Sequence, residues 1–193
     1  MTPASANAEV ARSLVSGVIA LGLLLVSSLS AVAQSAPCPI VNASVVSAGL
    51  GTPVTDTTQP PFTTVVDICD FVDAAGNEIN VYHESNVFAP GQGGTAALAL
   101  RYIPQLTDEM RAQLEALKLA DINIPIPGYQ VSTVNGLGDA AILIKSEVVP
   151  GTSVDTVIVQ RGSDTLSFNM DDLPDAQAKL TSLAQAVMAN LSP

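Results

Sequence analysis

The chain has 193 residues, and its 18 acidic and 7 basic side chains give it a formal net charge of −11. Nucleic acids attract proteins through clustered Lys and Arg, so nucleic acid and anionic membrane surfaces are excluded as favoured partners. With one His, two Cys and no Trp, the chain also lacks the residues for multi-histidine metal sites and paired CxxC motifs. We therefore expect neither a metal nor a cofactor, in a protein of one domain or at most two.

Residues 1–33 have the composition of a secretory leader. Arg12 is the only basic side chain in this stretch, residues 13–30 form an apolar run, and small residues lead up to Ala33. This pattern predicts a signal peptide that is cut between Ala33 and Gln34. The alternative is an uncleaved anchor, because the apolar run is long enough to cross a bilayer. The protein is expected to be exported, to the extracellular space, the periplasm or the cell envelope. Only residues 13–30 would contact the membrane, and only if the leader is retained.

Export changes the expected state of Cys38 and Cys69. Thiols outside the cytoplasm tend to pair, and with only two cysteines a single connectivity exists. The sequence therefore predicts a Cys38–Cys69 disulfide. The alternatives are two unrelated buried thiols, or a nucleophilic cysteine for which His83 is the one candidate base.

In the first half of the exported chain, a short helix is expected over 39–50, capped by Asn42 and ended by Gly51. The elements that follow are, in order, a Pro- and Thr-rich loop at 52–62, a strand at 63–72, a hairpin turn at 73–77 and a strand at 78–85. Alternating apolar residues identify the strands, and Gly and Asn identify the turn.

Residues 89–127 differ in character, and we interpret them as an insertion. A Gly-rich break at 89–94 precedes a segment, 95–103, that is ambiguous between a strand and a helix. Apolar residues at helical spacing then predict a helix from Thr107 to Ala120, and an extended linker follows it.

The last third of the chain alternates clearly enough to predict paired strands and a closing helix. The strands are expected at 130–134, 140–149, 154–160 and 165–170, and the helix runs from Pro174 in its first turn to Asn190. An apolar stripe along this helix is typical of packing against a sheet, and it consists of Ala176, Leu180, Leu183, Ala184, Val187, Met188 and Leu191. The expected fold class is α+β, a single domain over 34–193 with an antiparallel sheet flanked by helices.

The segment Gly136–Ala141 matches the dinucleotide-binding pattern GxGxxA, with Asp155 further along the chain. That kind of site requires a helix directly after the glycines, to present its N-terminus to the pyrophosphate. The residues after this segment are instead β-branched and alternate, as in a strand. We therefore interpret Gly136, Gly138 and Asp139 as a structural turn before a hairpin, with a phosphate cradle as the alternative.

Acidic residues around the first hairpin suggest a calcium site, and they are Asp67, Asp70, Asp73 and Glu78. A calcium loop places oxygen ligands at alternate positions, but on a strand Asp67 and Asp70 would project from opposite faces. A solvated acidic hairpin is the simpler interpretation, and weak surface calcium binding is the alternative. His83 lies on the next strand, where we expect a surface or hydrogen-bonded histidine rather than a base.

Several short motifs together resemble a known group of proteins. One Cys starts a short helix that ends in Leu50-Gly51, a second Cys lies in the first strand, Gly136–Ala141 precedes a hairpin, and Leu183-Ala184 lies in the last helix. This order is similar to that of small exported bacterial domains of unknown function, abundant as actinobacterial lipoproteins and similar in fold to PsbP-like proteins. The resemblance implies an antiparallel sheet flanked by helices and a bridged Cys pair, and it implies no catalytic residues.

These observations favour a non-enzymatic, exported domain that binds a protein, a lipid or a small ligand at the cell envelope. The leader, the resemblance and the lack of a GxSxG nucleophile motif support this hypothesis. Two alternatives stay open, a hydrolase that uses carboxylates and a structural envelope protein anchored by an uncleaved leader. A ligand pocket would be sought between the sheet and residues 89–127.

Overall fold

The computed structural model describes residues 37–59, 66–103, 106–117, 128–149, 152–171 and 175–191. The elements in these ranges are α1 (Ala43–Leu50), β1 (Val54–Asp56), β2 (Val66–Asp73), β3 (Glu78–Glu84), α2 (Thr95–Tyr102), α3 (Asp108–Leu117), β4 (Tyr129–Thr133), β5 (Ala140–Val149), β6 (Thr152–Arg161), β7 (Asp164–Asp171) and α4 (Ala176–Asn190). None of these helices is long and apolar enough to cross a membrane. The predicted leader, with its cleavage between Ala33 and Gln34, lies outside the described residues.

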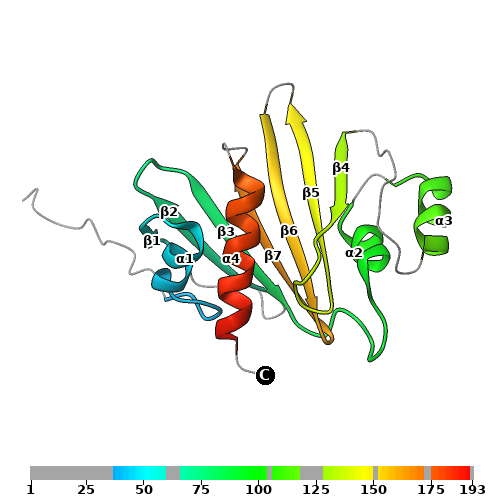
Figure 1. Cartoon of the computed structure of the whole chain (residues 1–193), viewed down its shortest axis with the longest axis horizontal. Coiled ribbons are helices and arrows are strands. Elements are labelled where there is room, and N and C mark those ends of the chain that lie inside the picture. Colours follow the sequence, from blue (N-terminus) through cyan, green and yellow to red (C-terminus); the bar gives the residue numbers. More distant parts are fainter. Residues whose placement is uncertain are drawn as a thin grey trace, which may run out of the picture. The chain divides into compact units, whose positions relative to one another are not determined.

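The seven strands form one antiparallel sheet in the order β1-β2-β3-β7-β6-β5-β4 (Figure 1). The first three strands pair in sequence, and β7 then returns from the C-terminal half of the chain to pair with β3. Strands β4 to β7 are joined as consecutive hairpins. The predicted α+β fold with an antiparallel sheet and flanking helices is confirmed.

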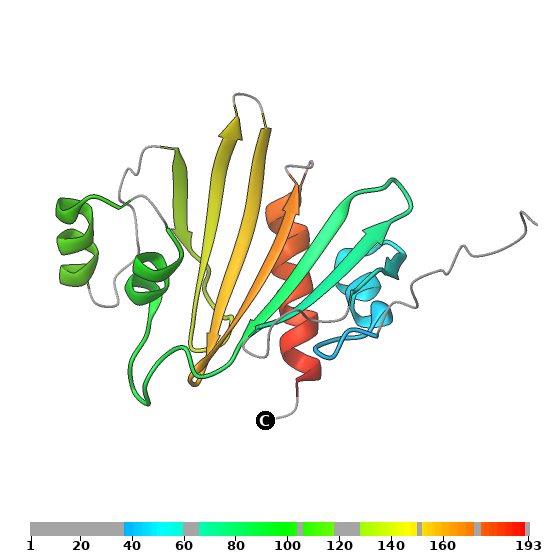
Figure 2. The ribbon, with the colours of Figure 1, turned by 180° about the vertical axis from the view of Figure 1, so that it is seen from behind.

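Helices lie on both faces of the sheet, α1 and α4 on one and α2 on the other (Figures 1 and 2). Strand β5 shows why both faces are apolar. Its Ala141 and Leu143 enter a core shared with α1 and α4, whereas Ile142 and Ile144 enter a second core shared with α2 and α3. The first core extends across β2, β3, β7 and β6, and the second is confined to β4, β5 and β6. The two cores therefore overlap at β5 and β6, and only the first reaches β2, β3 and β7.

The helices on the first face follow their sequence patterns closely. Asn42 caps α1 by accepting the N–H of Val45 at 3.1 Å, and Gly51 ends it with a φ of 70°. On α4, the apolar stripe packs against the sheet as predicted, with Leu180, Leu183, Ala184 and Val187 fully buried. Its predicted start at Pro174 lies outside the described residues.

One segment has a different structure from the one predicted, and a second segment, ambiguous in the sequence, is assigned by the structure. Residues 54–56, expected in a loop, form the short edge strand β1, because Asp56 and its neighbours pair with β2 despite their Pro/Thr-rich surroundings. The ambiguous segment 95–103 is mainly helix α2, whose Leu98 and Ala99 are fully buried in the second core. The region interpreted as an insertion thus supplies the helical layer of the second face.

Cys38 and Cys69 form the predicted disulfide, with their Cα atoms 5.3 Å apart. Cys69 lies on β2, fully buried under α1, and Cys38 lies just before α1. The backbone N–H of Cys38 also donates to Asp56 Oδ2 at 3.0 Å. The bridge therefore ties the segment that enters the domain to the sheet. A disulfide fits an oxidising location outside the cytoplasm.

Candidate functional site

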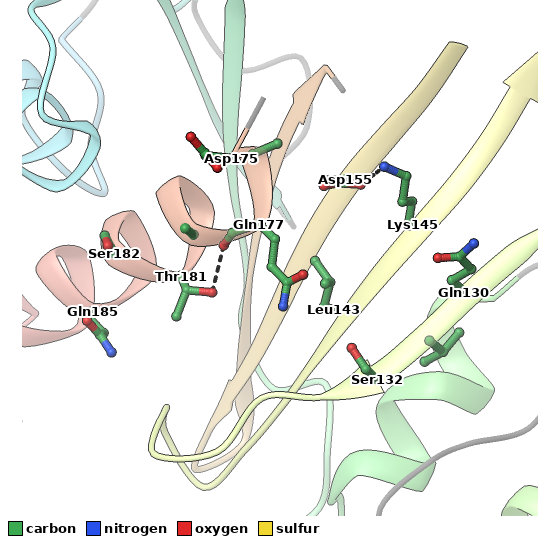
Figure 3. Close-up of a pocket in the computed structure, with 13 residues that line it drawn as sticks. Gln130, Ser132, Leu143, Lys145, Asp155, Asp175, Gln177, Thr181, Ser182 and Gln185 are labelled. Atoms are coloured by element: carbon green, nitrogen blue, oxygen red, sulfur yellow. Dashed lines mark hydrogen bonds and ion pairs between the residues drawn. The ribbon is translucent and has the colours of Figure 1, made fainter. Parts of the chain in front are cut away.

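A groove lies beside α4, where the sheet extends past the helix (Figure 3). Helix α4 packs mainly on β6 and β7 and covers only part of β5, so Gln130, Ser132 and Lys145 on the same face of β4 and β5 line a groove beside the helix. The groove has a volume of about 850 Å³, and its walls come from β4, β5, β6 and α4. It lies on the opposite face of the sheet from α2.

Strand alternation and register bring three polar side chains into one row on the groove floor. Gln130 on β4 lies opposite Lys145 on β5, and Lys145 lies opposite Asp155 on β6. The next residues along the strands, among them Val131 and Ile144, point to the other face and enter the second core. The row therefore runs from the outer strand of the sheet toward the first core.

Lys145 and Asp155 form an ion pair within this row. Lys145 Nζ lies 3.9 Å from Asp155 Oδ1, and the side chain of Asp155 is only 6% exposed, against 38% for Lys145. Withdrawing a carboxylate from water costs several kcal/mol, and a buried ion pair rarely stabilises a fold more than apolar side chains of similar volume. The pair is therefore weak evidence of a contribution to fold stability.

One side of α4 forms the opposite wall of the groove (Figure 3). Its polar residues recur at helical spacing, on the side of the helix that flanks the buried stripe, and they are Gln177, Thr181, Ser182 and Gln185. The Thr181 hydroxyl donates to the backbone carbonyl of Gln177 at 2.8 Å. Amide and hydroxyl side chains both donate and accept hydrogen bonds, so this wall can match a ligand that carries either kind of group.

The groove's side chains are suited to hydrogen bonding and charge pairing more than to acid–base chemistry. A hydroxyl nucleophile needs a base within hydrogen-bond reach, and the chain's one histidine, His83, does not line the groove. Two carboxylates do line it. Asp155 is paired with Lys145, and Asp175 points away from Asp155 (Figure 3). Glycosidase-type catalysis would require two carboxyl groups that flank one substrate bond.

His83 lies on β3 between two carboxylates. Its Nδ1 is 3.6 Å from Asp67 Oδ2, and its Nε2 is 3.4 Å from Asp164 Oδ2. Asp164 is itself held by the backbone N–H of Asn86, which donates to its Oδ1 at 2.8 Å. That bond is the main cause of a lowered pKa of Asp164, and bonds from Ser163 and His83 lower it further. The imidazole thus occupies a hydrogen-bonded position at the sheet surface.

The four acidic residues of the first hairpin do not share one site, because only Asp70 and Glu78 lie side by side in one shallow depression. Asp73 Oδ1 accepts the N–H groups of Ala75 and Asn77 at 2.8 and 2.9 Å, and its Oδ2 accepts the Asn77 side-chain amide at 2.7 Å. These bonds, the one from the Asn77 side chain above all, lower the pKa of Asp73. Asp67 and Asp70 project from opposite faces of β2, as the alternation predicted. Among the described residues, no three metal-ligating side chains converge.

The predicted turn at Gly136, Gly138 and Asp139 leads directly into β5. The two glycines have φ values of 80° and 55°, and a Cβ at Gly138 would overlap the backbone carbonyl of Gln160. Asp139 Oδ2 accepts the N–H of Gly162 at 2.6 Å, so its carboxylate joins this turn to the β6–β7 turn. Because a strand follows the glycines, no helix N-terminus faces a phosphate here. Asp155, the acidic residue that followed the dinucleotide-binding pattern in the sequence, lies in the groove beside α4.

A buried glutamine, not singled out in the sequence, holds the Gly-rich segment 89–94 in place. Gln160 Oε1 accepts the N–H of Gly94 at 2.7 Å, and its Nε2 donates to the carbonyls of Gln92 and Gly162 at 2.9 and 3.0 Å. A Cβ at Gly93 would overlap the same side chain. These contacts anchor the connection between the sheet and α2.

The groove residues were not identified from the sequence either, although a weak signal was present. Lys145 and Asp155 each interrupt a core-facing apolar series, after Leu143 on β5 and before Val157 on β6. A polar residue toward the end of a strand is common, however. Only the strand register and the position of α4 show that these side chains share one groove.

Comparisons with protein-family models, curated proteins and solved structures find no match to this chain. The resemblance to exported PsbP-like domains therefore stays a prediction from short sequence motifs. The function has to be inferred from the geometry of the chain itself.

Proposed function

We propose that this protein is an exported binding domain that takes a small zwitterionic ligand, of the class of short peptides, in the groove between α4 and β4–β6. The Lys145–Asp155 pair on the groove floor is the observation that carries the proposal. A ligand with its own carboxylate and ammonium groups can complement both of these charges. The amide and hydroxyl side chains of the groove floor and of α4 can then form hydrogen bonds with the peptide groups that lie between the two charges of the ligand.

The size and lining of the groove support this class of ligand over the others considered. Its volume of about 850 Å³ lies within the range of small-molecule sites. An acyl chain is not favoured, because polar side chains form most of the α4 wall and of the floor. Nucleic acid is disfavoured by the net charge of −11.

Export is the second part of the proposal, and it is supported by the disulfide and the apolar leader. Cleavage between Ala33 and Gln34 would release the domain from the membrane, whereas a retained leader would anchor it through residues 13–30. N-terminal sequencing of the exported protein distinguishes these cases. A sequence that starts at Gln34 supports release, and one that starts upstream of residue 13 supports the anchored form.

Ligand binding is tested by titrating the exported, ¹⁵N-labelled protein with three probes: trialanine, N-acetylglucosamine and sodium decanoate. We expect trialanine alone to cause saturable shifts at the backbone amides of Gln130, Ser132 and Lys145. Trialanine capped by acetyl and amide groups should bind more weakly, because it lacks both charges. Saturable binding of decanoate or of the sugar in the groove, or no binding of trialanine there, would contradict the proposal.

A charge-matched pair of variants identifies the role of the lysine. Lys145→Met should weaken trialanine binding by about tenfold, because one charge-assisted contact is lost. Lys179→Met removes the same charge from α4 outside the groove and should leave binding unchanged. Equal effects of the two substitutions would show that only net charge matters.

A further inference from the structure

On the face of the sheet opposite α1 and α4, the strands β2, β3 and β7 carry a surface that differs from the groove. On the side where α2 lies, the second core is confined to β4, β5 and β6. No described helix lies over β2 and β3 on this side (Figure 2). Strand register places one set of side chains there, which we call the open face: Ile68, Asp70, Glu78, Asn80, Tyr82 and Ser167.

The centre of the open face is apolar. Ile68 on β2 lies directly opposite Tyr82 on β3, and such cross-strand pairs contact each other through their side chains. Ile68 is 37% exposed, and it is the one large hydrophobic side chain that the described residues leave exposed. Tyr82 is partly withdrawn from water, which raises its pKa, and the nearby Asp70 carboxylate raises it further. An aromatic–aliphatic pair in this state is typical of the centre of a protein interface.

The rim beside this centre is acidic. Asp70 and Glu78 line a small depression of about 260 Å³ next to Asn80 and Thr57. Asp70 Oδ1 accepts the side-chain amide of Asn80 at 2.9 Å. Next to the open face, at the end of β3 near α2, Glu84 is paired with Arg101 at 2.7 Å. Among the described residues, the acidic side chains of the open face, Asp70 and Glu78, form no ion pair.

Charge decides which occupant this surface fits. Two copies of a chain with a net charge of −11 repel each other, so a second copy is disfavoured. A membrane with anionic lipids is disfavoured for the same reason. A partner with Lys or Arg beside an apolar side chain would match both the rim and the centre.

We propose that the open face docks a segment of another protein that carries basic side chains next to apolar ones. Its apolar side chain would pack on Ile68 and Tyr82, and its basic side chain would enter the depression between Asp70 and Glu78. This surface and the groove lie on opposite faces of the sheet, so the two proposals do not depend on each other.

The test uses two synthetic peptides of equal length, one alternating Leu and Lys and the other alternating Leu and Glu. Each is titrated into the exported, ¹⁵N-labelled protein. We expect the Leu-Lys peptide to cause saturable shifts at Ile68, Asp70, Asn80 and Tyr82, and the Leu-Glu peptide to cause none. Binding of the Leu-Glu peptide at these positions, or Leu-Lys shifts spread evenly over other acidic surfaces, would overturn the proposal.

Variants locate the interaction. Asp70→Asn preserves the bond from Asn80 but removes the charge, and it should weaken Leu-Lys binding by about tenfold. Ile68→Ser changes an exposed side chain and should weaken binding to a similar extent. Glu115→Gln, on the exposed surface of α3, removes the same charge elsewhere and should have no effect. If Asp70→Asn and Glu115→Gln weaken binding equally, the peptide responds to net charge and the open face is not its site. Concentration-dependent dimerisation that is lost in Ile68→Ser would instead identify a second copy as the occupant.

Discussion

Gly49 of α1 lies so close to Leu183 of α4 that a Cβ atom at position 49 would come within 2.7 Å of the Leu183 Cα. The obstructing atom belongs to the backbone, so it cannot move aside by changing a rotamer. The two helices of the first layer therefore depend on a residue without a side chain at their contact.

Gly49→Val should destabilise the domain by about 1–3 kcal/mol, because α1 and α4 must move apart to admit the side chain. Chemical denaturation followed by circular dichroism measures the change. Ala48→Val is the matched control, since Ala48 is exposed on the same helix. Because valine has a higher helix propensity than glycine, propensity alone predicts no loss at position 49, and a Gly49→Val variant as stable as the unmodified protein would contradict the close contact.

The disulfide should make a large contribution to stability. Cys38→Ser is expected to lower the free energy of unfolding by roughly 2–5 kcal/mol, as for native disulfides in small secreted domains. Adding a reductant to the unmodified protein should lower its stability to a similar extent and should not affect Cys38→Ser. If a thiol reagent modifies two cysteines in the native protein before reduction, the bridge does not form in solution.

The two glycines of the Gly136–Asp139 turn should respond differently to alanine. Both have positive φ, but a Cβ is blocked by the Gln160 carbonyl only at Gly138, whereas Gly136 faces open space. Gly138→Ala should therefore lower the melting temperature more than Gly136→Ala. The Gly136→Ala variant measures the cost of positive φ alone, which is about 1–2 kcal/mol in the free energy of unfolding. A larger loss at Gly136 would contradict this account.

The same turn should not bind a dinucleotide, because a strand follows it. We expect no change in the melting temperature of the unmodified protein when NAD is added. Since a ligand of the native state raises the melting temperature, an upward shift with NAD would restore the phosphate-cradle interpretation.

Acid should weaken the contribution of Asp164 to stability. Its pKa in the folded state is lowered below the ordinary value of 3.8, first by the N–H of Asn86 and then by Ser163 and His83. A carboxyl with a lowered folded pKa stabilises the fold at pH values above its unfolded pKa, and this contribution is lost as the pH falls through the folded pKa. Asp164→Asn should therefore lose less stability than the unmodified protein between about pH 5 and pH 2. Parallel stability–pH curves would contradict the assignment.

The Lys145–Asp155 pair should be replaceable without loss of the fold. Lys145→Leu alone leaves the buried Asp155 carboxylate without this cation, and we expect a loss of up to about 3 kcal/mol. The double variant Lys145→Leu/Asp155→Leu should recover most of that stability, because the groove floor then becomes apolar. It should nevertheless fail to bind trialanine. A double variant less stable than the single one would show that the pair holds the fold together.

The sequence by itself determined the features that depend on neighbouring residues. The caps of α1, the hairpin at Asp73–Asn77, the buried stripe of α4 and the alternation of β2 follow from local chemistry and periodicity, which act within a few residues. The disulfide was also predictable, because a chain with two cysteines allows only one intramolecular pairing, and the predicted export favours it.

Tertiary structure alone decided where surfaces meet and where they stay open. Lys145 and Asp155 become neighbours through the register of β5 and β6, and α4 turns that row into a groove by packing over β6 and β7. Ile68 stays exposed because the second helical layer is confined to β4, β5 and β6. Side-chain alternation tells which residues share a face, but it carries no information on which helix covers that face. That choice is made by the packing of segments far apart in the chain.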